Sequence, residues 1–156
     1  MVRLGLDDFA RKMIGRIDAI DLPVKGAMIK KGERLFSVRQ GERVAVLQAP
    51  VSGKVHEVNV ELPHHLDWIT RRPYEHGWVC SLQPEHLADE LGHLKIGENA
   101  AAWYQAEIAR LQQLLGSAPG DGVPSAAPAV GSLTEGQLEQ ADDRTWGRFT
   151  QSFLQT

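Results

Sequence analysis

The sequence predicts a mainly β fold with helices added towards its carboxyl end. Short apolar runs fill the first 84 residues, and glycine or proline turns separate them at intervals of about 8 to 12 residues. After Pro84 the apolar residues change to helical spacing. A chain of 156 residues is long enough for one ordinary domain with extensions and too short for two large domains.

The chain opens directly on a strand-like run, Val2–Leu6. Because an unpaired edge strand is a liability, we expect either that the true start lies earlier or that this strand pairs with another chain. Asp7 and Asp8 predict the start of a short helix over Phe9–Ile14, and Gly15 predicts its end.

The central feature is a predicted hairpin formed by the runs Leu35–Val38 and Val44–Leu47. The polar stretch Gln40–Arg43, which contains a glycine, would form its tip. Such a tip can hold a side chain, or a group attached to it, clear of a small β domain. Further strands are predicted at residues 16–22, 27–29, 51–60 and 78–82, and a short helix at 63–69.

The carboxyl-terminal part is predicted to be helical. A helical hairpin is expected over 85–94 and 99–115, and the stretch 116–132, rich in Ala, Pro, Gly and Ser, predicts a flexible linker. The segment 133–154 predicts an amphipathic helix that either folds back on the body or docks into the groove of a partner. The apolar face of the second helix would carry Ala102, Trp103, Ala106, Ala109, Leu111 and Leu114 or Leu115. That of the last helix would carry Leu138, Ala141, Thr145, Trp146, Phe149 and Phe153.

Composition and charge exclude several classes of protein. The net charge of −3 and the scattered basic residues give no nucleic-acid footprint. The single cysteine, Cys80, excludes an intramolecular disulfide, and its apolar surroundings predict a small buried side chain. Neither a membrane-spanning run nor a secretory signal is evident, so we expect a cytoplasmic protein.

The sequence offers no catalytic or metal-binding constellation. His64 and His65 are adjacent and point in different directions on a helix, whereas His86 and His93 are too far apart for direct chelation. There is no Ser-His-Asp order that stands out and no glycine-rich phosphate loop. We therefore expect a protein that is not an enzyme, with no catalytic residue and no metal.

Several motifs together resemble one known family, the H protein of the glycine cleavage system, whose fold is the barrel-sandwich hybrid of lipoyl carriers. The resemblance covers about residues 2–84. It implies an H-protein-like domain at 1–84 that lacks the family's amino-terminal hairpin, a helical extension at 85–115, the linker at 116–132 and a docking helix at 133–156. The motifs are Leu4–Ala10, Asp21–Pro23, Lys31–Glu33, Ala49–Gly53 with Val58-Asn59, and Pro73–Trp78.

The resemblance fails at the hairpin tip. In the family this tip carries Glu-Ser-x-Lys-Ala, and its lysine bears the lipoyl arm. An ungapped count places Glu42 at the lysine position, and a slip of one residue places Arg43 there. Neither side chain is an acceptor, because a carboxylate has no amine and a guanidinium is a poor nucleophile at neutral pH. The nearest lysine, Lys54, lies in the following strand, so we expect no lipoyl cofactor.

Three functions are compatible with these observations. The first is an H-protein-like docking or adapter module without lipoylation, serving protein partners such as a redox complex of iron–sulfur or disulfide-reductase type. The second is a lipoyl carrier of glycine cleavage that uses an atypical lysine. The third is an assembly or regulatory subunit bound through its carboxyl-terminal helix. The partner-binding candidates are Arg39, Gln40, Glu42 and Arg43 at the tip and Trp146, Phe149 and Phe153 in the tail.

Overall fold

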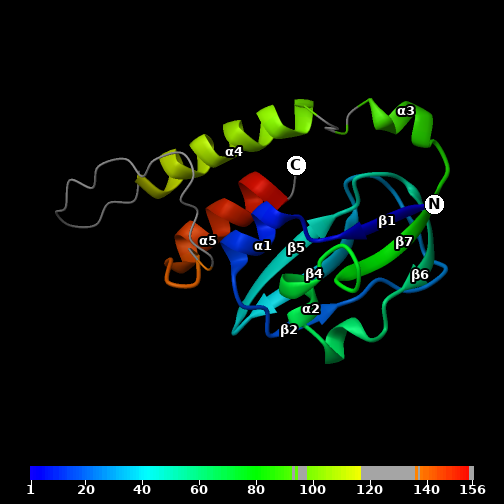
Figure 1. Cartoon of the computed structure of the whole chain (residues 1–156), viewed down its shortest axis with the longest axis horizontal. Coiled ribbons are helices and arrows are strands. Elements are labelled where there is room, and N and C mark those ends of the chain that lie inside the picture. Colours follow the sequence, from blue (N-terminus) through cyan, green and yellow to red (C-terminus); the bar gives the residue numbers. More distant parts are fainter. Residues whose placement is uncertain (93, 95–97, 117–135, 137, 155–156) are drawn as a thin grey trace.

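The computed structural model of the chain describes residues 1–92, 94, 98–116, 136 and 138–154 (Figure 1). Its strands are β1 (Val2–Gly5), β2 (Ala19–Asp21), β3 (Met28–Ile29), β4 (Arg34–Gln40), β5 (Arg43–Gln48), β6 (Gly53–Val58) and β7 (Trp78–Pro84). Its helices are α1 (Asp8–Ile14), α2 (Asp67–Arg71), α3 (Leu87–Leu91), α4 (Glu98–Gly116) and α5 (Asp143–Phe149), with a 3₁₀ turn η1 (Leu62–His64) and a π-helix η2 (Thr150–Leu154).

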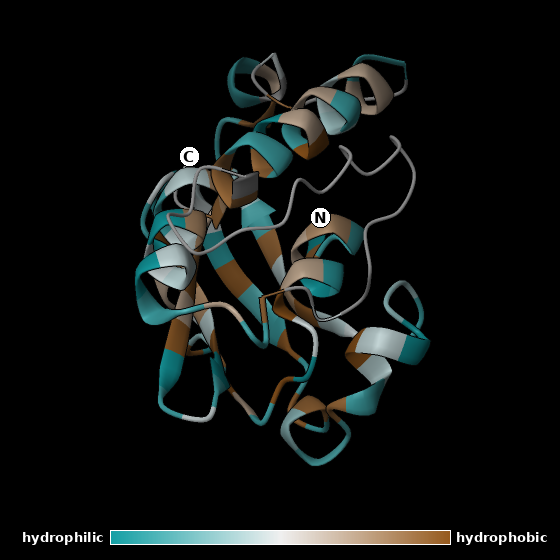
Figure 2. Cartoon of the chain, turned by 90° about the vertical axis from the view of Figure 1, so that its left-hand side faces the viewer, coloured by the Kyte–Doolittle hydropathy of each residue, from teal (hydrophilic) through white to brown (hydrophobic). Residues whose placement is uncertain are grey.

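The strands form two antiparallel sheets. One has the order β1-β7-β6-β3 and the other the order β2-β4-β5. Apolar and polar residues both occur along the strands, as the brown and teal bands in Figure 2 show, and β4 and β7 each bury four residues in a row. The inward side chains, among them Val38, Ala45, Val55 and Val79, are at most 1% exposed and form the core. The predicted mainly β architecture is therefore confirmed.

The opening strand finds its partner within the chain. β1 pairs with β7, with Leu4 opposite Cys80, in contrast to the expectation of a partner in another chain. The expectation for Cys80 itself is confirmed, because the side chain is fully buried. Burial disfavours the thiolate and raises the pKa of Cys80 to about 11, so this thiol is a core side chain and no nucleophile.

The helix α1 has the predicted ends. Asp7 accepts a hydrogen bond from the Ala10 amide (2.7 Å), and Gly15 closes the helix with φ of +74°. The apolar side packs inward, with Phe9, Met13 and Ile14 buried. This short helix lies beside the carboxyl-terminal helices, on the flank of the sheets where α4 and α5 also lie (Figure 1).

The long helix α4 turns inward a face that matches the predicted one only in part, since Leu111 is buried and Leu115 packs on the core as predicted. Tyr104, Ile108 and Leu111 face the body, and Tyr104 meets Phe9 edge-on with ring centroids 5.6 Å apart. The predicted face is wrong for Ala102, Trp103, Ala106 and Ala109, which are all exposed. The alanines of this helix are spread over several of its faces, so the spacing of apolar residues was compatible with more than one buried face. Contact with Phe9 selects the face that carries Tyr104, Ile108 and Leu111.

The last helix is shorter than predicted. α5 begins only at Asp143, because Asp142 caps it by accepting a hydrogen bond from the Thr145 amide (2.7 Å). Residues 138–140 form turns, and residues 133–135 and 137 lie outside the described part, as does the predicted linker except for Gly116. Within the described ranges, no helix is both long and apolar enough to cross a membrane.

Candidate functional site

The β4–β5 hairpin ends in a two-residue turn. Gln40 pairs with Arg43, which leaves Gly41 and Glu42 as the turn residues, and Gly41 has φ of +58°. Two-residue hairpin turns require positive φ, which glycine adopts without strain. Glu42 is exposed, and an added Cβ on Gly41 would meet nothing within 4 Å. The predicted hairpin is thus confirmed, and its tip projects from the surface.

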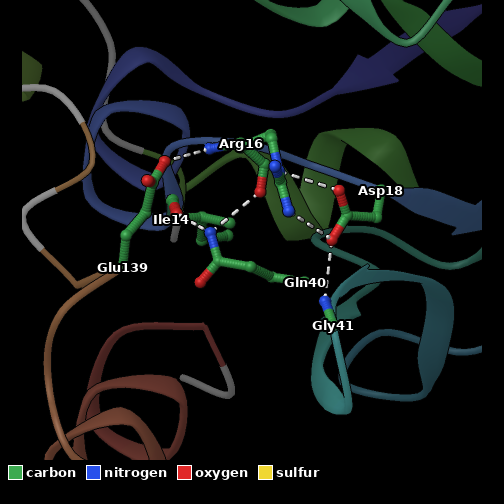
Figure 3. A network of polar contacts seen from close by, with 6 residues as sticks. All are labelled: Ile14, Arg16, Asp18, Gln40, Gly41 and Glu139. Atoms are coloured by element: carbon green, nitrogen blue, oxygen red, sulfur yellow. Dashed lines mark hydrogen bonds and ion pairs between the residues drawn. The ribbon is translucent and has the colours of Figure 1, made fainter.

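Polar contacts fix the tip against the start of β2 (Figure 3). The Gly41 amide donates to Asp18 Oδ2 (2.8 Å), and Arg16 Nε pairs with Asp18 Oδ1 (2.9 Å). The hydrogen bond from Gly41 is the main cause that lowers the pKa of Asp18, with the charge of Arg16 acting in the same direction. Asp18 therefore remains an anion that holds the turn in one position.

Gln40, Gly136 and Leu138 close the carboxyl end of α1. Gln40 Nε2 donates to the carbonyls of Ile14 (2.7 Å) and Arg16 (2.9 Å), as Figure 3 shows. The last carbonyls of a helix have no partner within it, and burial without one is costly. The other free carbonyls at this end of α1 also accept hydrogen bonds. The Gly15 amide donates to the Arg11 carbonyl (2.9 Å), the Gly136 amide to the Lys12 carbonyl (2.8 Å) and the Leu138 amide to the Met13 carbonyl (3.1 Å).

Arg43 connects the hairpin to the carboxyl-terminal tail, which we define as residues 136 and 138–154. Its Nε pairs with Asp143 Oδ1 (2.9 Å), while Nη1 and Nη2 donate to the carbonyls of Leu138 (3.1 Å) and Ala141. Its guanidinium also lies 5.5 Å from the ring centroid of Trp146. The planar guanidinium presents N–H donors in several directions, so it can bind the Asp143 carboxylate and both carbonyls at once. The single ammonium group of a lysine could not satisfy all of these acceptors together.

The aromatic face of the tail packs on its own chain. Phe149 is fully buried and Trp146 is 5% exposed. Phe9 lies 6.1 Å from Phe149 and 5.6 Å from Phe153 between ring centroids, and Arg110 covers Phe153 at 4.7 Å. These three aromatic residues are the predicted candidates for binding a partner. In the folded chain Trp146 and Phe149 belong to the core, and Phe153 is partly buried against it. Burial of their apolar surface is the physical reason for this docking in cis.

Two of the partner-binding candidates predicted at the tip are exposed to solvent. Glu42 is exposed, and Arg39 makes an ion pair with Asp21 at 3.6 Å on the surface. Gln40 and Arg43 are held by hydrogen bonds within the chain.

The sequence did not indicate three other residues of the site, Arg16, Asp18 and Glu139. The alternation of Arg16 and Asp18 in the predicted strand at 16–22 was a usable signal for the first two, although the structure has strand only over Ala19–Asp21. Nothing in the sequence linked Glu139, whose Oε1 accepts from the Arg16 amide (2.6 Å), to the hairpin.

Replacing Arg43 by alanine is expected to lower the free energy of unfolding by about 2 to 3 kcal/mol, because it leaves two tail carbonyls and Asp143 without their charged donor. Arg39→Ala is the matched control on the same hairpin. Because the ion pair of Arg39 with Asp21 is about half exposed, this variant is expected to lose less than about 1 kcal/mol of the free energy of unfolding. Urea unfolding of both variants measures the difference, and equal losses would show that Arg43 does not anchor the tail.

The site contains no arrangement suited to bond-making chemistry. In the part of the chain that the structure describes, no group of three or more His, Cys, Asp or Glu side chains could hold a metal ion. The polar groups at the tip are paired with each other and with backbone, and they fix its shape. What the geometry offers is a rigid projecting turn with Glu42 at its end.

Two small antiparallel sheets with such a hairpin define a β module of the barrel-sandwich class. A sequence model of the family described as "Glycine cleavage H-protein" matches residues 1–107, which extends the resemblance past Pro84 into α4. The chain belongs to the glycine cleavage H-protein family. As a member of this family it is not itself an enzyme.

Two relatives known from their sequences agree with this assignment. The chain is 37% identical over 105 residues to a probable glycine cleavage system H protein of Pyrococcus abyssi, an alignment that covers 67% of this chain and 78% of the relative. It is 39% identical over 88 residues to a glycine cleavage system H protein of Geobacillus sp., covering 56% and 69%. The crystal structure of a glycine cleavage system H protein from Mycobacterium marinum is 28% identical, with a TM-score of 0.49 over 57% of this chain and 75% of that one.

Proposed function

We propose that this chain is an H-protein-type docking module that carries no lipoyl group and binds protein partners with its hairpin tip. The observation that carries the proposal is that Glu42 lies on an exposed two-residue turn. An ungapped count of the sequence places this residue at the position of the family's lipoyl-lysine. A carboxylate has no amine with which to form the amide bond of a lipoyl arm. The projecting shape is retained while the attachment group is absent.

The neighbouring residues support the same function. Arg43, the alternative attachment position, is committed to the tail through its ion pair with Asp143 and its backbone contacts. Arg39 and Glu42 are the tip side chains left to meet a partner. The partners we propose are cytoplasmic proteins, either redox-complex subunits or enzymes of the glycine-cleavage type.

Intact-mass spectrometry after co-expression with a lipoate ligase and lipoate tests the proposal. The wild-type chain is expected to keep its unmodified mass. The matched control is Glu42→Lys, which restores an amine on the same turn and is expected to gain one lipoyl group if the ligase recognises the hairpin. A lipoylated H protein of known competence, expressed in parallel, verifies that the ligase is active. One lipoyl adduct on the wild-type chain would overturn the proposal.

A lipoyl carrier of glycine cleavage with an atypical lysine is the second candidate. The names of the relatives favour it, since both the Pyrococcus and Geobacillus proteins are glycine cleavage system H proteins. Lys25 and Lys31 are exposed beside glycines with positive φ, Gly26 and Gly32, so each lies in a tight turn. Peptide mapping of any modified chain separates the candidates, because an adduct on a lysine identifies the acceptor.

A further inference from the structure

A basic depression lies on the surface of the sheet formed by β3, β6 and β7, well away from the hairpin tip. It has a volume of about 270 Å³ and includes the side chains of Lys25, Lys54 and His56, with Gln83 at its edge. All four residues are exposed. In Figure 1, β6 lies at the opposite side of the molecule from α5, so the tail does not cover this surface.

The local backbone brings these side chains together. The register of β6 against β7 shifts between Val55 and Glu57, so His56 is an extra residue in a bulge. A bulge redirects a side chain, and here both His56 and Glu57 are exposed in succession. The Gly26 amide donates to the Val55 carbonyl (2.8 Å), which holds the turn with Lys25 against the same strand.

The lysines of the basic depression make no ion pair among the described residues, and the carboxylate nearest in the chain, Glu57, lines the adjoining depression instead. None of the ion pairs or side-chain hydrogen bonds found among the described residues includes Lys25, Lys54 or His56, and no acidic residue lines the basic depression. Ammonium groups held around one depression repel each other, and a bound anion relieves that repulsion. The depression is therefore complementary to a carboxylate or another anionic group.

An apolar depression adjoins the basic one and shares Lys25 with it. Its volume is about 490 Å³, and Leu22, Pro23, Val58 and Val60 line it together with Glu57. Val60 is 67% exposed and the neighbouring Val24 is 74% exposed, so apolar surface is open to a ligand here. A ligand that spans both depressions must combine negative charge with an apolar side chain.

We propose that these two depressions together form a docking surface for an acidic segment of a protein partner, with carboxylates at Lys25, Lys54 and His56 and an aliphatic side chain against Leu22, Val58 and Val60. Charge complementarity selects the acidic residues, and burial of apolar area adds affinity. This inference rests on the proposed docking function and gives the partner its chemistry. It uses no residue of the hairpin tip.

The test uses the full-length chain and a fluorescein-labelled synthetic peptide in which glutamates flank one leucine. Fluorescence anisotropy is expected to show binding that weakens as salt is added. The double variant Lys25→Gln/Lys54→Gln is expected to bind about tenfold more weakly, since it removes both ammonium groups. In ¹H–¹⁵N spectra, the amides of residues 54–60 should shift on addition of the peptide.

The matched control is Lys12→Gln/Arg148→Gln, which removes the same net charge from exposed positions outside both depressions. It is expected to change affinity less than about twofold. Equal weakening by both double variants, or undiminished binding of a peptide with glycine in place of leucine, would overturn the inference. Competition by inorganic phosphate as effective as the peptide would also overturn it, because it would indicate a site for small anions.

Failure of this inference is distinguishable from failure of the proposed function. Tip variants Arg39→Ala and Glu42→Ala should leave peptide binding unchanged, because those residues line neither depression. A lipoyl adduct on the wild-type chain with peptide binding retained would overturn only the proposed function. An unmodified chain that does not bind the peptide would overturn only the docking surface.

Discussion

Phe149→Ala is expected to lower the free energy of unfolding by about 3 to 5 kcal/mol, as large-to-small substitutions of buried aromatic residues do. Phe149 is fully buried and packs between Phe9 and Phe153, at centroid distances of 6.1 Å and 5.2 Å. Alanine would leave a cavity where α1 meets the tail. Urea unfolding followed by circular dichroism measures the loss.

Tyr74→Ala is the matched control for this prediction. Tyr74 is also aromatic but is 76% exposed, so its removal is expected to cost less than about 1 kcal/mol. A Phe149→Ala protein that unfolds at the same urea concentration as the Tyr74→Ala protein would contradict the buried position of the tail. It would favour a helix that docks elsewhere.

Gly15→Ala is expected to destabilise the chain by about 3 kcal/mol or more, through contact as well as through backbone strain. An added Cβ would lie 2.6 Å from the Gly136 Cα, which is backbone and cannot move aside as a side chain does. It would also displace the Glu139 carboxylate that accepts from the Arg16 amide. The substitution therefore separates α1 from the tail.

Gly26→Ala isolates the contribution of the backbone. Gly26 also has positive φ, at +85°, but an added Cβ there would meet nothing within 4 Å. Gly26→Ala is expected to lower the free energy of unfolding by about 1 kcal/mol, because a residue with a side chain is strained at positive φ. Thermal unfolding of both variants gives the comparison. Similar melting temperatures would argue that Gly136 and Glu139 do not approach α1 closely.

The β body was predictable from local patterns. Turn glycines at residues 26, 32 and 41 and the alternation along the strands are short-range signals, and the structure has positive φ at each of these glycines. The end of α1 at Gly15 followed from the same kind of signal. Such signals depend on neighbouring residues alone, so they are readable in one sequence.

Local sequence patterns could not predict the contacts of the tail. Arg43 meets Asp143 across 100 residues, and the stretch between them contains no pattern that fixes their distance in space. The aromatic face of α5 indicated that it must be buried, but apolar surface is non-directional and did not specify what covers it. The outcome depended on Phe9 and on the carbonyls at the end of α1, which only the folded chain brings into position.

The long separation between Arg43 and Asp143 also bears on how this protein is made. β5 is an edge strand, and η2 at the end of the tail packs against it. At about 5 to 20 residues per second, a ribosome adds the intervening 100 residues in roughly 5 to 20 seconds. During that interval a nascent chain presents an uncovered strand edge and an open end of α1. Folding of the last segment therefore follows synthesis of the body, and a chaperone has its best opportunity to bind in that interval.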